Sequence, residues 1–244
     1  MSVSSSLREE NVTCPIVSAK VIACKKVLPF IKNDMILGLG TGSTAEIFLD
    51  LLSDHIRHHN IKITATTTSI RTRLKAEELG MSLIPQNQVT RTDLCIDGTD
   101  EFDNNFHMIK GGGGALLCEK IIAQSADKML GITDESKFSK DFGRFPLPIE
   151  INPFETGITF AQLKTTHAKH AQSEFKVNVR KTKSGDVFKT DMGHLIVDLV
   201  FEKIEDPNNL YIDLLKIAGV VEHGLFLNEA DIILTNAREL HRER

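Results

Sequence analysis

The segment 93–120 combines carboxylates, a lysine and a glycine run between two apolar stretches. The groups in it that could move protons or bind hydroxyls are Asp97, Asp100, Glu101, Asp103, Lys110 and Glu119. The four glycines 111–114 cost chain entropy, and a loop gains from them where its backbone approaches a ligand closely or adopts positive φ. A solvated acidic loop with a flexible connector is the alternative. Few structural needs explain the mixture, so we expect acid–base chemistry on a bound ligand.

Short elements should bring these groups to one edge of a sheet. The elements expected here are a buried strand at 94–96, a short strand at 108–109 and a helix over 115–126. The turn signal Asp97-Gly98 ends the first strand, so Asp97 and Asp100 follow its carboxyl end, where open α/β sheets bind ligands. The second strand delivers Lys110 and the glycines to the same edge. Glu119 falls about one turn inside the amino end of the helix.

A second glycine loop joins a strand to a helix earlier in the chain. A buried strand over 35–39 runs directly into Gly40-Thr41-Gly42-Ser43-Thr44, and a helix from Ala45 to about Leu52 follows. This arrangement points backbone N–H groups and the positive helix end at an anion, so a phosphate is the expected ligand. An ordinary tight turn capped by Ser43 is the alternative.

The kind of phosphate ligand can be narrowed. Residues 40–45 match the dinucleotide pattern G-x-G-x-x-A, but the next strand, over 61–65, ends in hydroxyl residues at 66–69 instead of the acid that holds a ribose. The loop also lacks the Gly-Lys-Ser/Thr of a nucleotide-triphosphate site. Thr41, Ser43 and Thr44 add hydroxyl donors that suit a small phosphorylated polyol better than a nucleotide.

The chain changes character at the proline-rich segment 145–148. Before it we expect a helix over 71–79, a strand at 81–84 and a strand at 129–132 that leads to Lys137, a candidate phosphate or hydroxyl ligand. After it the expected elements are a strand at 149–151, a helix over 160–170, strands at 175–179 and 195–201 around a turn at 184–185, a helix over 208–217 and a strand at 220–226. This βαββαβ order is the ferredoxin-like plan. A last strand at 230–234 should rejoin the first sheet.

The predicted fold class is therefore α/β, a Rossmann-like open-sheet domain with an inserted α+β ferredoxin-like domain. The catalytic domain should comprise residues 1–145 plus 227–244. The inserted domain should comprise residues 146–226 and act as a lid or a dimerisation surface.

Composition and charge exclude several classes of function. A net charge of -4 and a pI near 6.1 argue against nucleic acid or an anionic membrane as the main partner. Cys14, Cys24, Cys95 and Cys118 form no C-x-x-C pair, so reduced thiols and a cytoplasmic location are expected. The polar amino end lacks the apolar core of a signal peptide, no run is long enough to span a bilayer, and the first ten residues should be loosely ordered.

Two further patterns have ordinary explanations. His55 and His59 have the i, i+4 spacing of a metal pair, but no acid or cysteine accompanies them, so a solvated helix end is expected. The basic segment 176–183 alternates like the exposed face of a strand, and no aromatic residues interleave with it, which argues against nucleic-acid contact.

Four motifs in register resemble those of type A ribose-5-phosphate isomerases. They are GLGTGSTA at 38–45, DGTDEFD at 97–103, KGGGGALLCEK at 110–120 and TDESK at 133–137, followed by FPLPIE. The resemblance covers nearly the whole chain after the amino-terminal tail. Two positions depart from the family: Cys118 replaces a frequent arginine, and residues 66–69 are a variant of a serine/threonine-rich loop.

The resemblance implies a role for each matching residue. Glu119 would be the proton acceptor, with Asp97 and Lys110 as further catalytic groups. The implied substrate-binding residues are Thr41, Gly42, Ser43, Thr44, Asp97, Gly98, Thr99, Asp100, Lys110, Gly111, Gly112, Gly113 and Lys137, of which 41–44 chiefly hold the phosphate and Asp97 and Asp100 contact sugar hydroxyls. The implied partners are a small sugar phosphate and a second copy of the chain in a homodimer, with no metal and no cofactor.

The chemistry of these residues agrees with those roles. Interconversion of ribose 5-phosphate and ribulose 5-phosphate moves a proton between adjacent carbons through an enediolate, and one carboxylate such as Glu119 can serve both carbons. Lys110 and the glycine amides could stabilise the developing charge. Asp97 or Asp100 could assist opening of the sugar ring, and the sequence does not divide that role. The alternatives are an isomerase or deaminase acting on another sugar phosphate, or a sugar-phosphate sensor that has lost catalysis.

Overall fold

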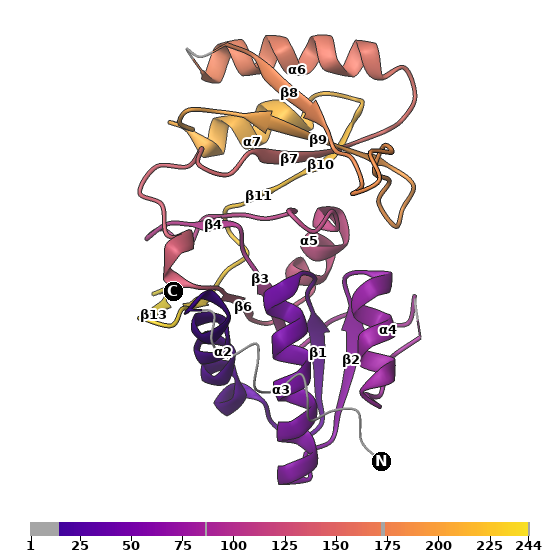
Figure 1. The fold of residues 1–244 in the computed structure, drawn as a ribbon, viewed down its shortest axis with the longest axis vertical. Helices are drawn as coiled ribbons and strands as arrows, with labels where there is room; N and C mark the ends of the chain where they lie inside the picture. The colour runs from indigo at the N-terminus through magenta and orange to yellow at the C-terminus, as the bar shows by residue number, and fades with distance from the viewer. Residues whose placement is uncertain (1–14, 86, 172–173, 244) are drawn as a thin grey trace.

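The structure is a computed structural model, and it describes residues 15–85, 87–171 and 174–243. Its helices are α2 (Pro15–Val27), α3 (Ser43–His59), α4 (Ile70–Glu78), α5 (Leu116–Gln124), α6 (Thr156–His170) and α7 (Pro207–Leu215), with short 3-10 turns at Leu28–Phe30 and Glu135–Lys137. The first ten residues, for which we expect loose order, and Cys14 lie outside the described residues. Figure 1 shows two layered units, one above the other.

The lower unit contains a six-stranded sheet. Its strands are β1 (Met35–Leu39), β2 (Ile63–Thr67), β3 (Leu94–Gly98), β6 (Met129–Ile132), β12 (Ile232–Leu234) and β13 (Glu239–His241), in the order β13-β12-β6-β3-β1-β2. All neighbours are parallel except the antiparallel edge pair of β12 and β13. Apart from Asp97 in β3, the residues of the central strands β3 and β6 are apolar or glycine, as burial on both faces requires of a parallel strand.

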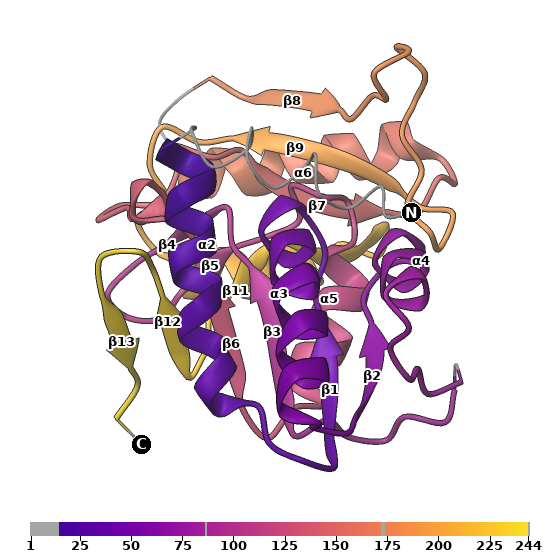
Figure 2. The ribbon, with the colours of Figure 1, turned by 60° about the horizontal axis from the view of Figure 1, so that its bottom comes forward.

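Helices cover both faces of this sheet. Leu94 and Ile96 of β3 pack in the core with residues of α2 and α3, which lie side by side in Figure 2. Cys95, which points to the opposite face, packs in a second core with Ala123 of α5. The two-residue alternation of a strand thus sends adjacent apolar residues of β3 to two different helix layers.

The upper unit contains an antiparallel four-stranded sheet. Its strands are β7 (Leu147–Ile151), β8 (Lys176–Val179), β9 (Leu195–Val200) and β10 (Val220–His223), in the order β10-β7-β9-β8. With α6 after β7 and α7 after β9, this is the βαββαβ arrangement that the sequence predicts, so the α/β fold class with a ferredoxin-like α+β unit is confirmed.

A small three-stranded sheet lies between the two units. It contains β4 (Glu101–Phe102), β5 (Met108–Ile109) and β11 (Leu225–Phe226) in the order β11-β5-β4. The prediction of a single strand at 220–226 is therefore wrong. This segment forms two strands, β10 and β11, which belong to different sheets. The division falls at Gly224, where the backbone presses so closely on the Lys110 carbonyl that a Cβ would lie 2.3 Å from that oxygen.

Several boundaries differ from expectation for local reasons. Helix α3 continues to His59 and not only to about Leu52, because its apolar face continues and Asn60 then ends it in the left-handed conformation. The strand expected at 81–84 is reduced to a single bridge between Leu83 and Ala65. Strand β2 begins at Ile63 and runs to Thr67, so part of the hydroxyl-rich segment belongs to the strand. The sequence patterns do not predict the short strands β4 and β13.

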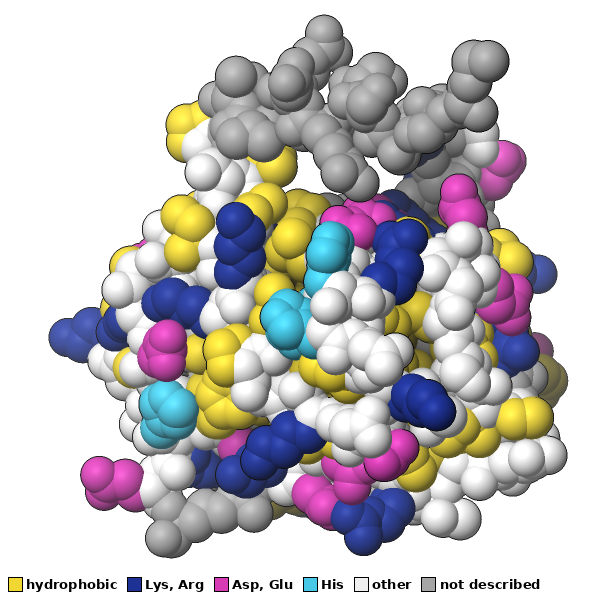
Figure 3. Space-filling model, turned by 90° about the horizontal axis from the view of Figure 1, so that it is seen from below, with side chains coloured by type: hydrophobic (Ala, Val, Ile, Leu, Met, Phe, Trp, Pro, Cys, Tyr) yellow, Lys and Arg dark blue, Asp and Glu magenta, His cyan; other side chains and the backbone are white. Residues whose placement is uncertain are grey.

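The face at the amino ends of the parallel strands carries mixed charges. Figure 3 views the molecule from below and shows acidic and basic side chains interspersed with apolar ones.

Within the described residues, no helix is long and apolar enough to cross a membrane, and no cluster of His, Cys, Asp and Glu could hold a metal ion. The Nδ1 atom of His59 instead contacts the His55 carbonyl at 3.0 Å, on a helix end.

Candidate active site

Two buried carboxylates share one buried lysine above the carboxyl end of β3. The Nζ atom of Lys110 lies 2.9 Å from Oδ2 of Asp97 and 3.4 Å from Oε2 of Glu119. It also donates a 2.6 Å hydrogen bond to the carbonyl of Gly98. All three charged side chains are at most 2% exposed. The structure thus brings together the three residues that the sequence singles out for catalysis.

The three side chains come from three different elements. Asp97 lies inside β3, which extends to Gly98, so the prediction that the strand ends before Asp97 is wrong. Lys110 follows the short strand β5, and Glu119 occupies the first turn of α5. Each is therefore held by hydrogen-bonded backbone, which fixes the relative positions of the carboxylates.

The first glycine loop is built against Asp97. The backbone N–H groups of Thr41 and Gly98 donate to Oδ1 of Asp97 at 3.1 and 2.7 Å. A Cβ at Gly40 would lie 1.9 Å from the same oxygen. Gly40 is therefore needed for close approach to a side chain, and the carboxylate of Asp97 ties the 40–44 loop to the lysine.

Burial and charge set the proton affinities of this group. Burial, with the neighbouring charge of Asp97, raises the pKa of Glu119 to about 8 despite the opposing effect of Lys110. Burial also raises the pKa of Asp97, while Lys110 and two backbone N–H groups oppose it. The pKa of Lys110, which burial would lower, is raised by the two carboxylates. Two backbone N–H groups stabilise the ionised form of Asp97 in addition to Lys110.

Glu119 is the carboxylate of this buried group that borders a cavity. Its Oε2 atom accepts no hydrogen bond within the described residues. The cavity has a volume of about 280 Å³. The neighbouring Cys118 is a neutral thiol, because burial and nearby carboxylates raise its pKa to about 11. A buried carboxylate that borders a cavity and has an oxygen without a hydrogen bond is placed to take a proton from a bound molecule.

The cavity collects most of the predicted substrate-binding residues. Those that border it are Thr41, Gly42, Ser43, Thr44, Gly98, Thr99, Asp100, Lys110, Gly111, Gly112, Gly113 and Lys137, together with the predicted base Glu119. Asp97 is not among them: it is fully buried and contacts residues that border the cavity, among them Lys110. Asp100 borders the cavity and accepts a 2.7 Å hydrogen bond from the N–H of Gly112.

One end of the cavity is suited to an anion. Gly42, with φ of 113°, precedes α3, whose first residues Ser43 and Thr44 border the cavity. Gly42, and not Ser43, is the N-cap, so the hydroxyl of Ser43 stays available to a ligand. The Nζ atom of Lys20 lies 3.0 Å from that hydroxyl. Helix N–H groups, a hydroxyl and an ammonium are the kinds of donor that bind a phosphate.

Hydroxyl side chains fix the shape of this loop from behind. The Oγ1 atom of Thr41 lies 2.7 Å from that of Thr68 and 2.8 Å from Oγ of Ser69. The hydroxyl of Thr72 donates to the carbonyl of Gly40 at 2.9 Å. The hydroxyl-rich segment that replaces the dinucleotide acid therefore supports the phosphate-type loop and leaves no ribose-binding carboxylate at the end of β2.

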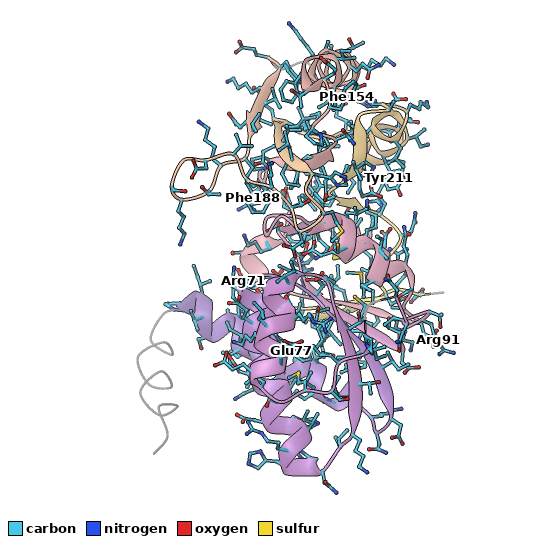
Figure 4. The ribbon with its side chains drawn as sticks, turned by 90° about the vertical axis from the view of Figure 1, so that its right-hand side faces the viewer. Arg71, Glu77, Arg91, Phe154, Phe188 and Tyr211 are labelled. Atoms are coloured by element: carbon cyan, nitrogen blue, oxygen red, sulfur yellow. The ribbon has the colours of Figure 1, made fainter. Side chains whose placement is uncertain are left out.

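Sequence reasoning missed three residues that border the cavity. Lys20 comes from α2, far from any motif, and Thr133 follows β6. Arg71 lies at the start of α4, where Figure 4 shows it near the junction of the two units, and its Nε pairs with Glu46. Signals existed for Thr133, which opens the motif at 133–137, and for Arg71, which closely follows the hydroxyl-rich segment. Lys20 needs the packing of α2 against α3.

Fold and site together define a class of protein. A parallel α/β sheet carries a phosphate-type loop, and a buried carboxylate–lysine group faces the same cavity, as in enzymes that move protons on small phosphorylated sugars. The family model of ribose 5-phosphate isomerase A (phosphoriboisomerase A) matches residues 64–239. The chain belongs to this family.

Relatives and solved structures agree with this membership. The chain is 43% identical over 204 residues to ribose-5-phosphate isomerase A of Bifidobacterium adolescentis, covering 84% of this chain and 85% of the relative. It is 44% identical over 211 residues to that of Brucella suis, covering 86% and 90%. The ribose 5-phosphate isomerase of Plasmodium falciparum has a similar structure, with a TM-score of 0.83, 32% identity and coverage of 92% and 98%.

A second solved structure adds a ligand to the comparison. It is a D-ribose-5-phosphate isomerase in complex with phospho-erythronic acid, with a TM-score of 0.85 and 34% identity. It covers 93% of this chain and 99% of its own. The correspondence therefore includes both units and the sheet between them.

Proposed function

We propose that this chain interconverts D-ribose 5-phosphate and D-ribulose 5-phosphate, with Glu119 as the proton-transferring base. The assignment of the base rests on one observation: Glu119 borders the cavity, and its Oε2 atom, 3.4 Å from Lys110, accepts no hydrogen bond within the described residues. Family membership supports the reaction, which belongs to the non-oxidative pentose phosphate pathway. It also argues against the sensor alternative and against another sugar phosphate as the main substrate.

The proton transfer follows from the positions of three groups. Glu119 removes the proton from C2 of the open-chain aldose, and the electron pair forms an enediolate between C1 and C2. The same carboxylic acid then returns the proton to C1, while the hydroxyl proton on O2 passes to O1, which gives the ketose. Lys110, buried and 3.4 Å from Glu119, is placed to stabilise the enediolate charge.

The two aspartates have different parts in this proposal. Asp100 borders the cavity, so it contacts the sugar hydroxyls and assists ring opening. Asp97 keeps Lys110 charged and in place from behind, and it acts as a positioning residue. The phosphate binds at residues 41–44 with Lys20, and Lys137 holds the opposite side of the substrate.

Assembly, location and the functional division of the chain remain predictions. A homodimer, a cytoplasmic location and a lid or dimerisation role for residues 146–226 are proposed from the sequence, with residues 1–145 plus 227–244 as the catalytic domain. Sedimentation of the purified protein over a range of concentrations tests the dimer, and a single monomeric species throughout would contradict it.

The reaction is tested by ketose formation from ribose 5-phosphate in the presence of EDTA. Wild-type turnover together with a loss of at least about 10²-fold in Glu119→Gln, which keeps its fold by circular dichroism, supports the assignment. Glu222→Gln is a matched control, since Glu222 pairs with Lys120 outside the cavity. Turnover that survives in Glu119→Gln moves the base elsewhere, and a wild type that binds ribose 5-phosphate without turnover favours the sensor.

A further inference from the structure

An arginine from the upper unit forms hydrogen bonds to the glycine loop at 111–114 from outside the cavity. Arg180, directly after β8, donates through Nη1 to the carbonyl of Gly111 at 2.6 Å and to that of Gly112 at 3.2 Å. Its Nε and Nη2 atoms pair with both carboxylate oxygens of Asp198 on β9. Arg180 is only 15% exposed and does not border the cavity. A bidentate pair of this kind fixes a guanidinium in one orientation.

The glycine loop is a β-turn with one rotatable peptide. The N–H of Gly114 donates to the carbonyl of Gly111 at 2.9 Å, so Gly112 and Gly113 are the central residues. Neither adopts positive φ, as in a type I turn, but glycine at both positions also permits type II. The two types differ by a half-rotation of the peptide between Gly112 and Gly113, so the sequence of the turn leaves its orientation open.

Arg180 selects one of the two orientations. The carbonyl of Gly112 points at Arg180, so the N–H of Gly113, on the opposite edge of the same planar trans peptide, points away from it. Gly113 borders the cavity, and its N–H donates no hydrogen bond within the described part of the chain. The peptide between Gly111 and Gly112 has the same orientation. Its carbonyl accepts from Arg180, and its N–H, on the opposite edge, donates to Asp100 at 2.7 Å.

We propose that the Arg180–Asp198 pair is a positioning element that keeps the Gly113 N–H directed at the enediolate oxygen. The inference rests on the proposed isomerase function and deepens it. Without Arg180 the peptide between Gly112 and Gly113 would rotate freely, and the N–H would leave the cavity for part of the time. Charge stabilisation in the transition state would fall, while binding of the phosphate, at the other end of the cavity, would not change.

A second contact from the same hairpin supports this role. Phe188, between β8 and β9, covers the end of the loop so closely that a Cβ at Gly114 would lie 2.5 Å from its ring. Figure 4 shows Phe188 at the underside of the upper unit, facing the lower one. The hairpin therefore holds the turn at Gly111, Gly112 and Gly114, and leaves Gly113 to the substrate.

The test uses Arg180→Met in the full chain, with Lys181→Met as the matched control. Lys181 is the next residue, is exposed and contributes the same charge. We expect kcat of Arg180→Met to fall about 10- to 100-fold, less than the about 10²- to 10³-fold cost of deleting an oxyanion donor, because the N–H is only freed to rotate. KM for ribose 5-phosphate should stay within about 3-fold of wild type, because the ground state gains little from this donor.

Two inhibitors separate positioning from general damage. Phospho-erythronic acid has a planar anionic carboxylate that resembles the enediolate, so its inhibition constant should rise by about the same factor as kcat falls. The inhibition constant of inorganic phosphate should not change. Equal weakening of both inhibitors would indicate collapse of the site and overturn the proposal, as would wild-type kcat in Arg180→Met.

A second variant, Asp198→Asn, tests the proposal if Arg180→Met does not fold. Asp198→Asn keeps the shape of the partner and removes its charge, so we expect a smaller fall in kcat in the same direction, with unchanged phosphate inhibition. Wild-type kcat in a folded Asp198→Asn would then overturn the proposal. Wild-type protein without turnover would remove the proposed function as well, whereas an active wild type with fully active variants removes only the inference.

Discussion

The Nζ atom of Lys110 lies 3.4 Å from Oε2 of Glu119, an oxygen that accepts no hydrogen bond within the described residues. The same ammonium lies 2.9 Å from Asp97, which also accepts two backbone N–H groups. One buried cation therefore balances two carboxylates unequally. We therefore expect Glu119 to be the group that exchanges a proton with the substrate, with Asp97 holding Lys110 in place.

Removal of Lys110 should affect stability and turnover together. In Lys110→Met, two carboxylates remain buried without a cation, so we expect the free energy of unfolding at pH 8 to fall by about 3–5 kcal/mol. The added change Asp97→Asn should restore much of that stability without restoring turnover, because the enediolate still lacks its ammonium. Urea unfolding and ketose formation measure the two effects. A double variant that regains turnover would contradict the role of Lys110.

The pH dependence of the reaction should follow Glu119. A base works only when it is deprotonated, and the pKa of Glu119 is raised to about 8. We therefore expect kcat/KM for ribose 5-phosphate to rise with pH and to level off above about pH 8. A profile that is flat between pH 5 and 8 would show that the base titrates at an ordinary carboxylate pKa.

The raised pKa of Glu119 should also make the free energy of unfolding depend on pH. Stability should fall as the pH rises, whereas kcat/KM should increase. The folded-state pKa of Glu119 exceeds the ordinary value of 4.5, so the folded state binds the proton more tightly than the unfolded state. This contribution is fully present below about pH 4.5 and is lost as the pH rises through about 8. The unfolding free energy of wild type should therefore fall relative to that of Glu119→Gln, which cannot titrate at this position, as the pH rises from 5 to 9. A constant difference across that range would contradict the shift.

Sequence patterns predict the site wherever chemistry and chain order coincide. The glycine loops follow strands, and strand ends meet at one edge of a parallel sheet, so the order of the motifs is enough to assign Thr41, Lys110 and Glu119 to one site. The βαββαβ order is likewise visible in the sequence, because apolar runs and helical spacing alternate clearly after residue 145.

The remaining features depend on contacts between distant segments. Lys20 reaches the site because α2 packs on α3, and Arg180 reaches the glycine loop because the upper unit rests on it. Asp97 lies in the strand and behind Lys110, which local turn signals cannot show. The split at Gly224 arises from close contact with the Lys110 backbone, which belongs to a much earlier part of the chain.

Loss of Lys20 should weaken substrate binding more than the chemical step. Its ammonium is 3.0 Å from the Ser43 hydroxyl at the proposed phosphate site, away from Glu119. In Lys20→Met we expect KM for ribose 5-phosphate to rise about 10- to 100-fold, as the loss of a charge-assisted hydrogen bond predicts. Lys25→Met removes an exposed lysine from the same helix and should leave KM unchanged. Equal KM values for the two variants would place the phosphate elsewhere.

Two glycine-to-alanine changes should have opposite effects on stability. A Cβ at Gly40 would lie 1.9 Å from Oδ1 of Asp97, so Gly40→Ala must displace that carboxylate from Lys110 and from its backbone donors. We expect a loss of at least about 2 kcal/mol in unfolding free energy, together with a large fall in kcat. Gly157, in α6, has open space at its Cβ position and no positive φ, so Gly157→Ala should stabilise the chain by about 0.5–1 kcal/mol. Urea unfolding midpoints and kcat measured on both variants give the comparison. A Gly40→Ala protein with wild-type kcat would mean that Asp97 does not need its present contacts to support Lys110 in the reaction.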